Sequence, residues 1–185
     1  GGISWILGHY FYGIHAGFPG TPTYFVLLRE PVERVLSNYS YLLTYPGSEY
    51  LRSWPAERFA EEHPEGSNLQ VRMLCGPDAP PDLALAQRRL EGFGAFGLTE
   101  RFDDSLRVLA ARFGWDDMSY RIENVTQGRV HREQLSERAL AIIRRRNELD
   151  AELYAFASDL FRSRLGRPWS RSAVTQSRSS ARLSS

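Results

Sequence analysis

Residues 24–28 form a continuous apolar run that ends directly in an Arg-Glu-Pro turn, and this junction constrains the fold more than any other feature. A short run of this kind is typical of a parallel strand that is covered on both faces. Pro31 can then occupy the first turn of a helix, where its missing N–H does no harm. Apolar side chains recur at helical spacing from Val32 to Leu43, before Pro46. We therefore predict a buried strand followed at once by an amphipathic helix.

The rest of the chain alternates strand-like and helical segments. Residues 3–7 are apolar and predict a second buried strand, and residues 95–98 predict a third. Residues 44–66 have no clear period and are expected to form a long excursion with short helical pieces. Further helices are expected over residues 68–74, 82–90, 99–113, 136–146 and 147–165. This alternation predicts an α/β fold with a parallel sheet flanked by helices.

The C-terminal part of the chain marks the end of a single domain. Asn147 and Asp150 stand three residues apart and predict a capped start for the last helix. No acidic residue follows Asp159, and Arg and Ser become frequent, so residues 166–185 are expected to be a disordered basic tail. Residues 1–165 are long enough to bury a stable core as one domain.

Composition excludes several classes of protein. Cys75 is the single cysteine, which excludes disulfide scaffolds and zinc ribbons, and no metal is expected. No apolar run approaches the roughly 18 residues that cross a bilayer, so no membrane span is expected in this segment. All 23 basic residues are arginine, which excludes a P-loop of the GxxxxGK(S/T) type because that motif needs lysine. An arginine-only chain indicates a GC-rich genome and favours a bacterial cytoplasm.

Arg29 and Ser37 are the first candidate binding residues. Arg29 ends the predicted strand, where α/β folds bind ligands, and Ser37 lies on the helix that follows. A guanidinium fork and a hydroxyl together suit a doubly charged phosphate. An Arg at a strand end equally forms ion pairs, here with Glu30 or Glu33, and a helical Ser commonly faces solvent. The residues alone therefore leave a phosphate site and a structural role open.

The same stretch, residues 24–39, resembles the 3′-phosphate signature of sulfotransferases that use 3′-phosphoadenosine-5′-phosphosulfate. In that signature an Arg at a strand end is followed eight residues later by a Ser, as Arg29 is by Ser37. Further segments resemble the branch that contains heparan and uronyl 2-O-sulfotransferases and related bacterial enzymes. They are the Gly-His segment 8–13, the Gly-Leu-Thr-Glu segment 96–106, the loop 124–129 and the Leu-Asp-Ala-Glu-Leu-Tyr segment 149–154.

The resemblance implies a fold, a reaction and a set of contacts. The family fold is a P-loop-like, three-layer arrangement with a parallel sheet flanked by helices. The family transfers a sulfuryl group from the nucleotide to an acceptor hydroxyl, which in the nearest branch belongs to a carbohydrate. Arg29 and Ser37 would bind the 3′-phosphate. Thr126 and Arg129 would contact the nucleotide from the late loop, although a plain glycine turn explains that segment equally well.

The resemblance also implies a general base. A hydroxyl that attacks sulfur must lose its proton, and a neutral imidazole accepts a proton well near neutral pH. The base of the family's Gly-His segment corresponds to His9. His15 is the alternative, although no motif position corresponds to it.

One element of the family is absent from the sequence. The family's basic 5′-phosphosulfate loop follows its first strand, and we expect that strand and loop to precede Gly1. We accordingly expect a marginally stable, self-associating fragment without measurable transfer. The alternative to an enzyme is a non-catalytic relative that binds adenosine 3′,5′-bisphosphate or another anionic partner.

The acceptor and the cell compartment are less constrained. Arg52 and Trp54 lie in the aperiodic excursion and are candidate acceptor contacts, while tryptophan is more commonly a core residue. The arginines of the tail lack interleaved aromatic residues, so no nucleic-acid partner is expected. Membrane anchoring in the Golgi, as in the animal relatives, is the alternative to a bacterial cytoplasm.

Overall fold

Two parallel strands form the sheet in the computed structural model, which describes residues 6–115 and 128–165. β1 (Phe25–Leu28) pairs with β2 (Ala95–Leu98), from Phe25 opposite Ala95 to Leu28 opposite Leu98. The predicted strands at 24–28 and 95–98 are therefore confirmed, as is their parallel direction.

The strand predicted over residues 3–7 is wrong where the structure describes it. Ile6 and Leu7 lie outside any strand and are 47% and 69% exposed. Within the described residues the sheet consists of β1 and β2, so nothing there pairs with this run. An apolar run alone does not distinguish a buried strand from an exposed segment. Residues 3–5 lie outside the described part of the chain.

Helices form most of the remaining structure. Each predicted helix is present within one to three residues of its expected bounds, and the excursion 44–66 contains two short helical pieces as expected. The α-helices are α1 (Pro31–Thr44), α2 (Ala56–Glu62), α3 (Leu69–Cys75), α4 (Leu83–Gly92), α5 (Phe102–Phe113), α6 (Glu137–Arg146) and α7 (Glu148–Leu165). The 3-10 helices are η1 (Ile14–Gly17), η2 (Glu49–Ser53), η3 (Thr99–Arg101) and η4 (Arg132–Gln134).

The strand and helix around Arg29 form for local reasons. Pro31 is the first residue of α1, and the Glu30 carboxylate accepts a hydrogen bond from the Glu33 N–H at 2.9 Å, which caps the helix. One face of α1 is buried through Val32, Val35, Leu36 and Tyr39. The helix ends at Thr44, because the next residue, Tyr45, is extended and precedes Pro46.

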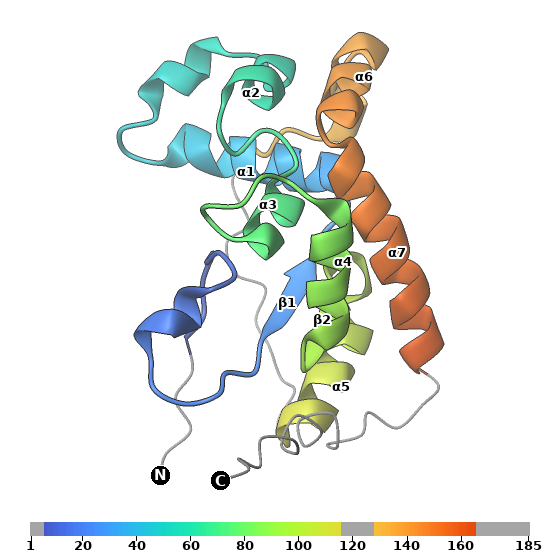
Figure 1. Cartoon of the computed structure of the whole chain (residues 1–185). Helices are drawn as coiled ribbons and strands as arrows, with labels where there is room; N and C mark the ends of the chain where they lie inside the picture. Colours follow the sequence, from blue (N-terminus) through green and yellow to red (C-terminus); the bar gives the residue numbers. More distant parts are fainter. Residues whose placement is uncertain (1–5, 116–127, 166–185) are drawn as a thin grey trace, which may run out of the picture.

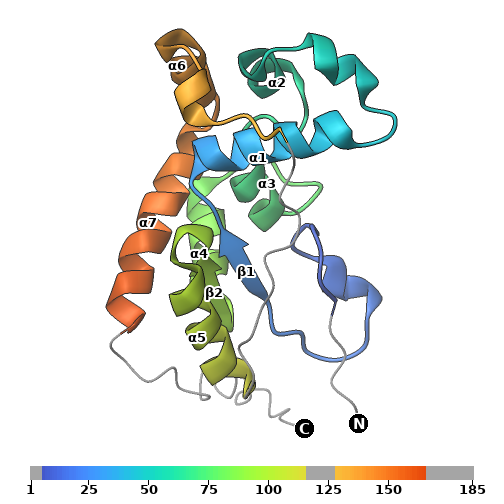
Figure 2. The same ribbon diagram turned by 180° about the vertical axis from the view of Figure 1, so that it is seen from behind.

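Two apolar cores meet at the junction between β1 and α1. The first surrounds the sheet and includes Leu28, and the second lies between α1, α2 and α6 and includes Val32. In both views α1 crosses the carboxyl ends of the strands, with α2 and α6 beyond it on the side away from the sheet (Figures 1 and 2). The chain therefore passes from one core to the other through Arg29 and Glu30.

Gly97 and Ser105 fix the end of β2. A Cβ on Gly97 would lie 2.4 Å from the Ser105 Cβ, so only glycine permits this packing. The Ser105 hydroxyl accepts a hydrogen bond from the Leu98 N–H at 2.8 Å and lies 2.9 Å from the Leu98 carbonyl oxygen. Position 97 of the Gly-Leu-Thr-Glu segment therefore accepts no side chain larger than that of glycine.

The predicted capping pair at the start of α7 is wrong. Asn68, which precedes α3, accepts a hydrogen bond from the Asp150 N–H through its side-chain oxygen at 3.2 Å. The Asn147 oxygen instead accepts from the Asn68 N–H and from Arg34, both at 2.9 Å. Tertiary partners thus replace the local pair that the spacing predicted. No helix in the described residues is long and apolar enough to cross a membrane.

Candidate functional site

Arg29 occupies the carboxyl end of β1, and its backbone is paired with one side chain. The Arg29 N–H donates to Gln70 Oε1 at 2.8 Å, and Gln70 Nε2 donates to the Arg29 carbonyl oxygen at 3.0 Å. The Arg29 side chain is half-buried. Its Nε is buried and has no hydrogen-bond partner among the described residues. No ion pair joins it to Glu30 or Glu33, the partners that a structural role predicts, within this part of the chain.

Arg129 approaches the same place from 100 positions further along the sequence. Burial lowers the pKa of Arg29, and the positive charge of Arg129 lowers it further. Arg129 Nη2 donates to Glu33 Oε2 at 2.6 Å, while its Nε is buried without a partner among the described residues. Arg129 is thus held against the first turn of α1, the helix that follows Arg29.

Ser37 lies one helical turn beyond Glu33, on the same face of α1. Its side chain is half-buried. Ser37 therefore shares a face of α1 with Glu33, the carboxylate that pairs with Arg129. Thr126, the fourth predicted nucleotide contact, lies outside the described residues.

Three carboxylates around Arg29 oppose the lowering of its pKa: Glu100, Glu33 and Glu30. Glu30 caps α1, as described above. Glu100 accepts hydrogen bonds from the Glu30 N–H at 2.9 Å and from the Tyr154 hydroxyl at 2.7 Å. Glu33 is thus the carboxylate that pairs directly with an arginine of the site. An incoming anion would compete with it for Arg129.

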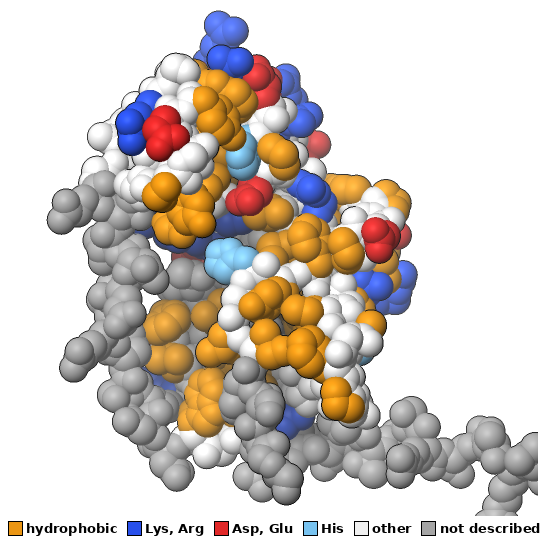
Figure 3. All heavy atoms as spheres, turned by 90° about the vertical axis from the view of Figure 1, so that its left-hand side faces the viewer, with side chains coloured by type: hydrophobic (Ala, Val, Ile, Leu, Met, Phe, Trp, Pro, Cys, Tyr) orange, Lys and Arg blue, Asp and Glu red, His pale blue; other side chains and the backbone are white. Residues whose placement is uncertain are grey.

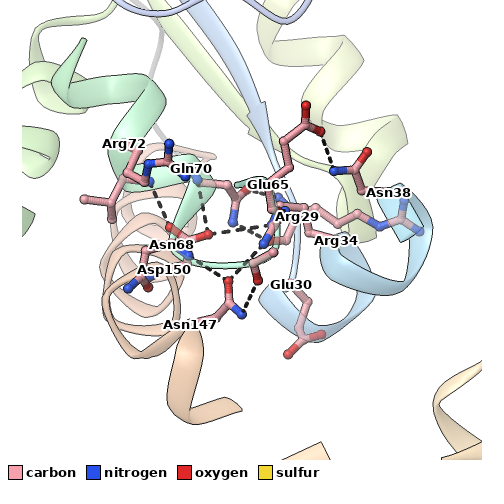
Figure 4. Close-up of polar contacts among 12 residues, drawn as sticks. Arg29, Glu30, Arg34, Asn38, Glu65, Asn68, Gln70, Arg72, Asn147 and Asp150 are labelled. Atoms are coloured by element: carbon pink, nitrogen blue, oxygen red, sulfur yellow. Dashed lines mark hydrogen bonds and ion pairs between the residues drawn. The ribbon is translucent and has the colours of Figure 1, made fainter. Parts of the chain in front are cut away.

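A buried polar network connects the start of α3 to α7 beside Arg29 (Figure 4). Asp150 accepts hydrogen bonds from the backbone N–H groups of Gln70 at 3.1 Å and Val71 at 2.8 Å. Arg34 lies 3.7 Å from the Asp150 carboxylate, and burial lowers the pKa of Arg34 and raises that of Asp150. Sequence reasoning missed Gln70, because one glutamine in a short helix carries no pattern.

His9 lies on an exposed bend and forms no hydrogen bond with another described residue. The adjacent Tyr10 lines a groove of about 620 Å³, and Phe11, Tyr12 and Arg89 are among its other lining residues. The Arg89 guanidinium lies 3.9 Å from the centre of the Tyr12 ring. Figure 3 shows that hydrophobic side chains gather on this face of the molecule.

His15, the alternative base, is engaged by a tyrosine. His15 Nδ1 lies 2.6 Å from the Tyr24 hydroxyl, which also accepts a hydrogen bond from the Gly13 N–H at 3.1 Å. The Tyr24 hydroxyl thus links His15 and Gly13 of the N-terminal segment to the residue that precedes β1.

The candidate acceptor contacts lie on the excursion that packs against α1. Arg52 is exposed on η2. The Trp54 ring is half-buried, and the Arg58 guanidinium lies over it at 4.4 Å from the ring centre. The backbone carbonyl oxygen of Trp54 accepts a hydrogen bond from the Tyr39 hydroxyl at 2.6 Å. Trp54 thus contributes to the second core, and one face of its ring is already covered.

The described residues contain no cluster of three or more His, Cys, Asp or Glu side chains that could hold a metal ion. No protein-family model, curated protein or solved structure matches this chain.

Proposed function

We propose that the chain is a sulfotransferase domain that uses 3′-phosphoadenosine-5′-phosphosulfate and transfers its sulfuryl group to an acceptor hydroxyl, of carbohydrate class. Arg29, Ser37 and Arg129 bind the 3′-phosphate of the nucleotide. The P-loop-like, three-layer fold is part of this proposal. It rests on the α/β arrangement of the described residues, in which helices surround the parallel pair β1 and β2.

One arrangement carries the proposal: Arg29 lies just beyond the carboxyl end of β1, and Arg129, far away in sequence, pairs with Glu33 in the first turn of the helix that follows. Each has a buried Nε without a partner in the described residues, so each retains donor capacity for an anion. A phosphate with two negative charges would satisfy both guanidinium groups and relieve their repulsion. The segments that carry the family resemblance also converge here, since Glu100, Asp150 and Tyr154 belong to the network around Arg29.

The chemistry assigned to the chain is positioning and proton transfer. The nucleotide supplies the activated sulfuryl group. Arg29, Ser37 and Arg129 hold the nucleotide by its 3′-phosphate, away from the reacting bond. His9 accepts the proton that the acceptor hydroxyl loses as its oxygen bonds to sulfur. Arg52, Trp54 and the groove beside Tyr10 are the proposed places for acceptor contacts.

Replacing Arg29 or Arg129 by alanine should weaken binding of adenosine 3′,5′-bisphosphate about tenfold or more. Loss of a charge-assisted hydrogen bond costs about 1.5–3 kcal/mol, which corresponds to this range. Isothermal calorimetry measures the affinity directly. Arg88→Ala on α4 is the control, because it removes one exposed positive charge away from the site. Unchanged affinity in folded Arg29→Ala and Arg129→Ala proteins would exclude the assignment.

Replacing Glu33 by glutamine should tighten binding of the same nucleotide about two- to fivefold. Glu33 pairs with Arg129 when no anion is present, and both side chains are about 30% exposed, so their pair is worth at most about 1 kcal/mol. Removing the charge frees Arg129 for the phosphate. If Glu33→Gln binds the nucleotide more weakly than the unaltered protein, Glu33 orders the site instead of competing for it.

A further inference from the structure

We propose that Gln70 is a positioning residue for the Arg29 guanidinium, and that α7 holds Gln70 and the adjoining turn in place. This inference rests on the proposed phosphate site at Arg29 and Arg129. It concerns a residue that would not touch the nucleotide. Its action is to fix the backbone from which the Arg29 side chain extends.

Gln70 pairs with Arg29 as a neighbouring strand would. Its side-chain amide accepts a hydrogen bond from the Arg29 N–H at 2.8 Å and donates one to the Arg29 carbonyl oxygen at 3.0 Å. Both backbone polar groups of Arg29 are therefore satisfied by one side chain, just beyond the last paired residue of β1. The peptide groups on both sides of the Arg29 Cα are fixed, and with them the direction of its side chain.

Gln70 is itself fixed by α7. The buried Asp150 carboxylate accepts from the Gln70 N–H through Oδ2 and from the Val71 N–H through Oδ1. Asn147, one turn earlier, accepts from the Asn68 N–H at 2.9 Å. Asn68 adopts a left-handed conformation, with φ 44°, and enters α3 in that state. Asp150 of α7 and Asn147, the residue before α7, thus set the position of the first residues of α3.

The other side of the turn is also tied to α7. Glu100 accepts from the Glu30 N–H at 2.9 Å and from the Tyr154 hydroxyl at 2.7 Å. Asp150 and Tyr154 are four residues apart and lie on one face of the helix. Three of the four backbone polar groups of Arg29 and Glu30, at Arg29 N, Arg29 O and Glu30 N, are therefore linked through Gln70 and Glu100 to this face, while the Glu30 carbonyl oxygen accepts from the Arg34 N–H within α1.

The hydrogen bonds from Gln70 matter because the Arg29 side chain is only half-buried and its Nε has no hydrogen-bond partner among the described residues. Fixing the Arg29 backbone limits the directions in which this side chain can extend. It thereby lowers the ordering cost of binding an anion. We expect Gln70 to strengthen binding of the 3′-phosphate and to leave binding of the rest of the nucleotide unchanged.

The test compares Gln70→Met with Ser105→Ala. Methionine keeps the length of the side chain and removes both hydrogen bonds to Arg29. Ser105 is a matched control, because its hydroxyl contacts the N–H and the carbonyl oxygen of Leu98 at the end of the neighbouring strand. Each protein is titrated with adenosine 3′,5′-bisphosphate and with adenosine 5′-monophosphate, and the ratio of the two affinities isolates the 3′-phosphate.

Gln70→Met should lower this ratio about tenfold, the lower end of the loss found when a residue that orients a metal-binding side chain is removed. Ser105→Ala should lower the melting temperature and leave the ratio unchanged. Amide hydrogen exchange at Arg29 should accelerate in Gln70→Met and stay slow in Ser105→Ala. This second readout does not depend on nucleotide binding.

An unchanged ratio or unchanged exchange at Arg29 in Gln70→Met would overturn the positioning role, as would an equal fall in the ratio in Ser105→Ala. The proposed function fails in a different way. If the unaltered protein binds both nucleotides equally, there is no 3′-phosphate site for Gln70 to organise. If the unaltered protein prefers the bisphosphate and Gln70→Met retains that preference, only the positioning role is wrong.

Discussion

Replacing Asp150 with alanine should lower the free energy of unfolding by about 3–5 kcal/mol. The carboxylate is fully buried, lies 3.7 Å from the Arg34 guanidinium and accepts two backbone hydrogen bonds from α3. Alanine leaves a buried positive charge without its counter-ion and two N–H groups without an acceptor. Urea unfolding followed by circular dichroism measures the change.

Asp159→Ala is the matched control for this experiment. Asp159 lies on the same helix and pairs with Arg162, but both side chains are mainly exposed. Exposed ion pairs contribute little, so this variant should change the free energy of unfolding by no more than about 0.5 kcal/mol. A loss below about 1 kcal/mol in Asp150→Ala, similar to the control, would show that the network does not hold α3 against α7.

In a form of the protein that includes the family's 5′-phosphosulfate strand and loop, replacing His9 with alanine should lower the rate of sulfuryl transfer by about 10²–10⁴-fold, as expected for loss of a general base. Affinity for adenosine 3′,5′-bisphosphate should stay nearly unchanged, because the phosphate contacts are made by Arg29, Ser37 and Arg129. Transfer from labelled donor measures the rate.

His15→Ala separates a base from a structural histidine. His15 is hydrogen-bonded to Tyr24, so its loss should lower stability and affect the rate far less than His9→Ala. The opposite pattern, with normal transfer in His9→Ala and none in His15→Ala, would assign the base to His15. Binding without transfer in every variant and in the unaltered protein would favour the non-catalytic alternative.

The sequence alone was sufficient to predict the strands and helices whose signals are local. The apolar run before Arg29, the proline at the first position of α1 and the helical spacing after it define β1 and α1 without tertiary information. Arg29 and Arg129 could be selected because each falls in a segment that resembles the sulfotransferases. Their mutual proximity could not be derived, because it depends on how residues 128–131 return to α1.

The remaining features depend on contacts between distant segments. Asn147 and Asp150 have the spacing of a capping pair, yet their side chains bind Asn68, Gln70 and Val71 about 80 positions away. Buried N–H groups at the start of α3 need acceptors, and this requirement outweighs the local preference. Gln70 pairs with Arg29 across 41 positions, which no periodicity encodes.

The most direct measurement is the affinity of the unaltered protein for adenosine 3′,5′-bisphosphate compared with adenosine 5′-monophosphate. The two ligands differ only in the 3′-phosphate that Arg29, Ser37 and Arg129 are proposed to bind. We predict at least about tenfold tighter binding of the bisphosphate, since a phosphate held by two guanidinium groups gains charge-assisted hydrogen bonds. Equal affinity for the two nucleotides would contradict the proposed site.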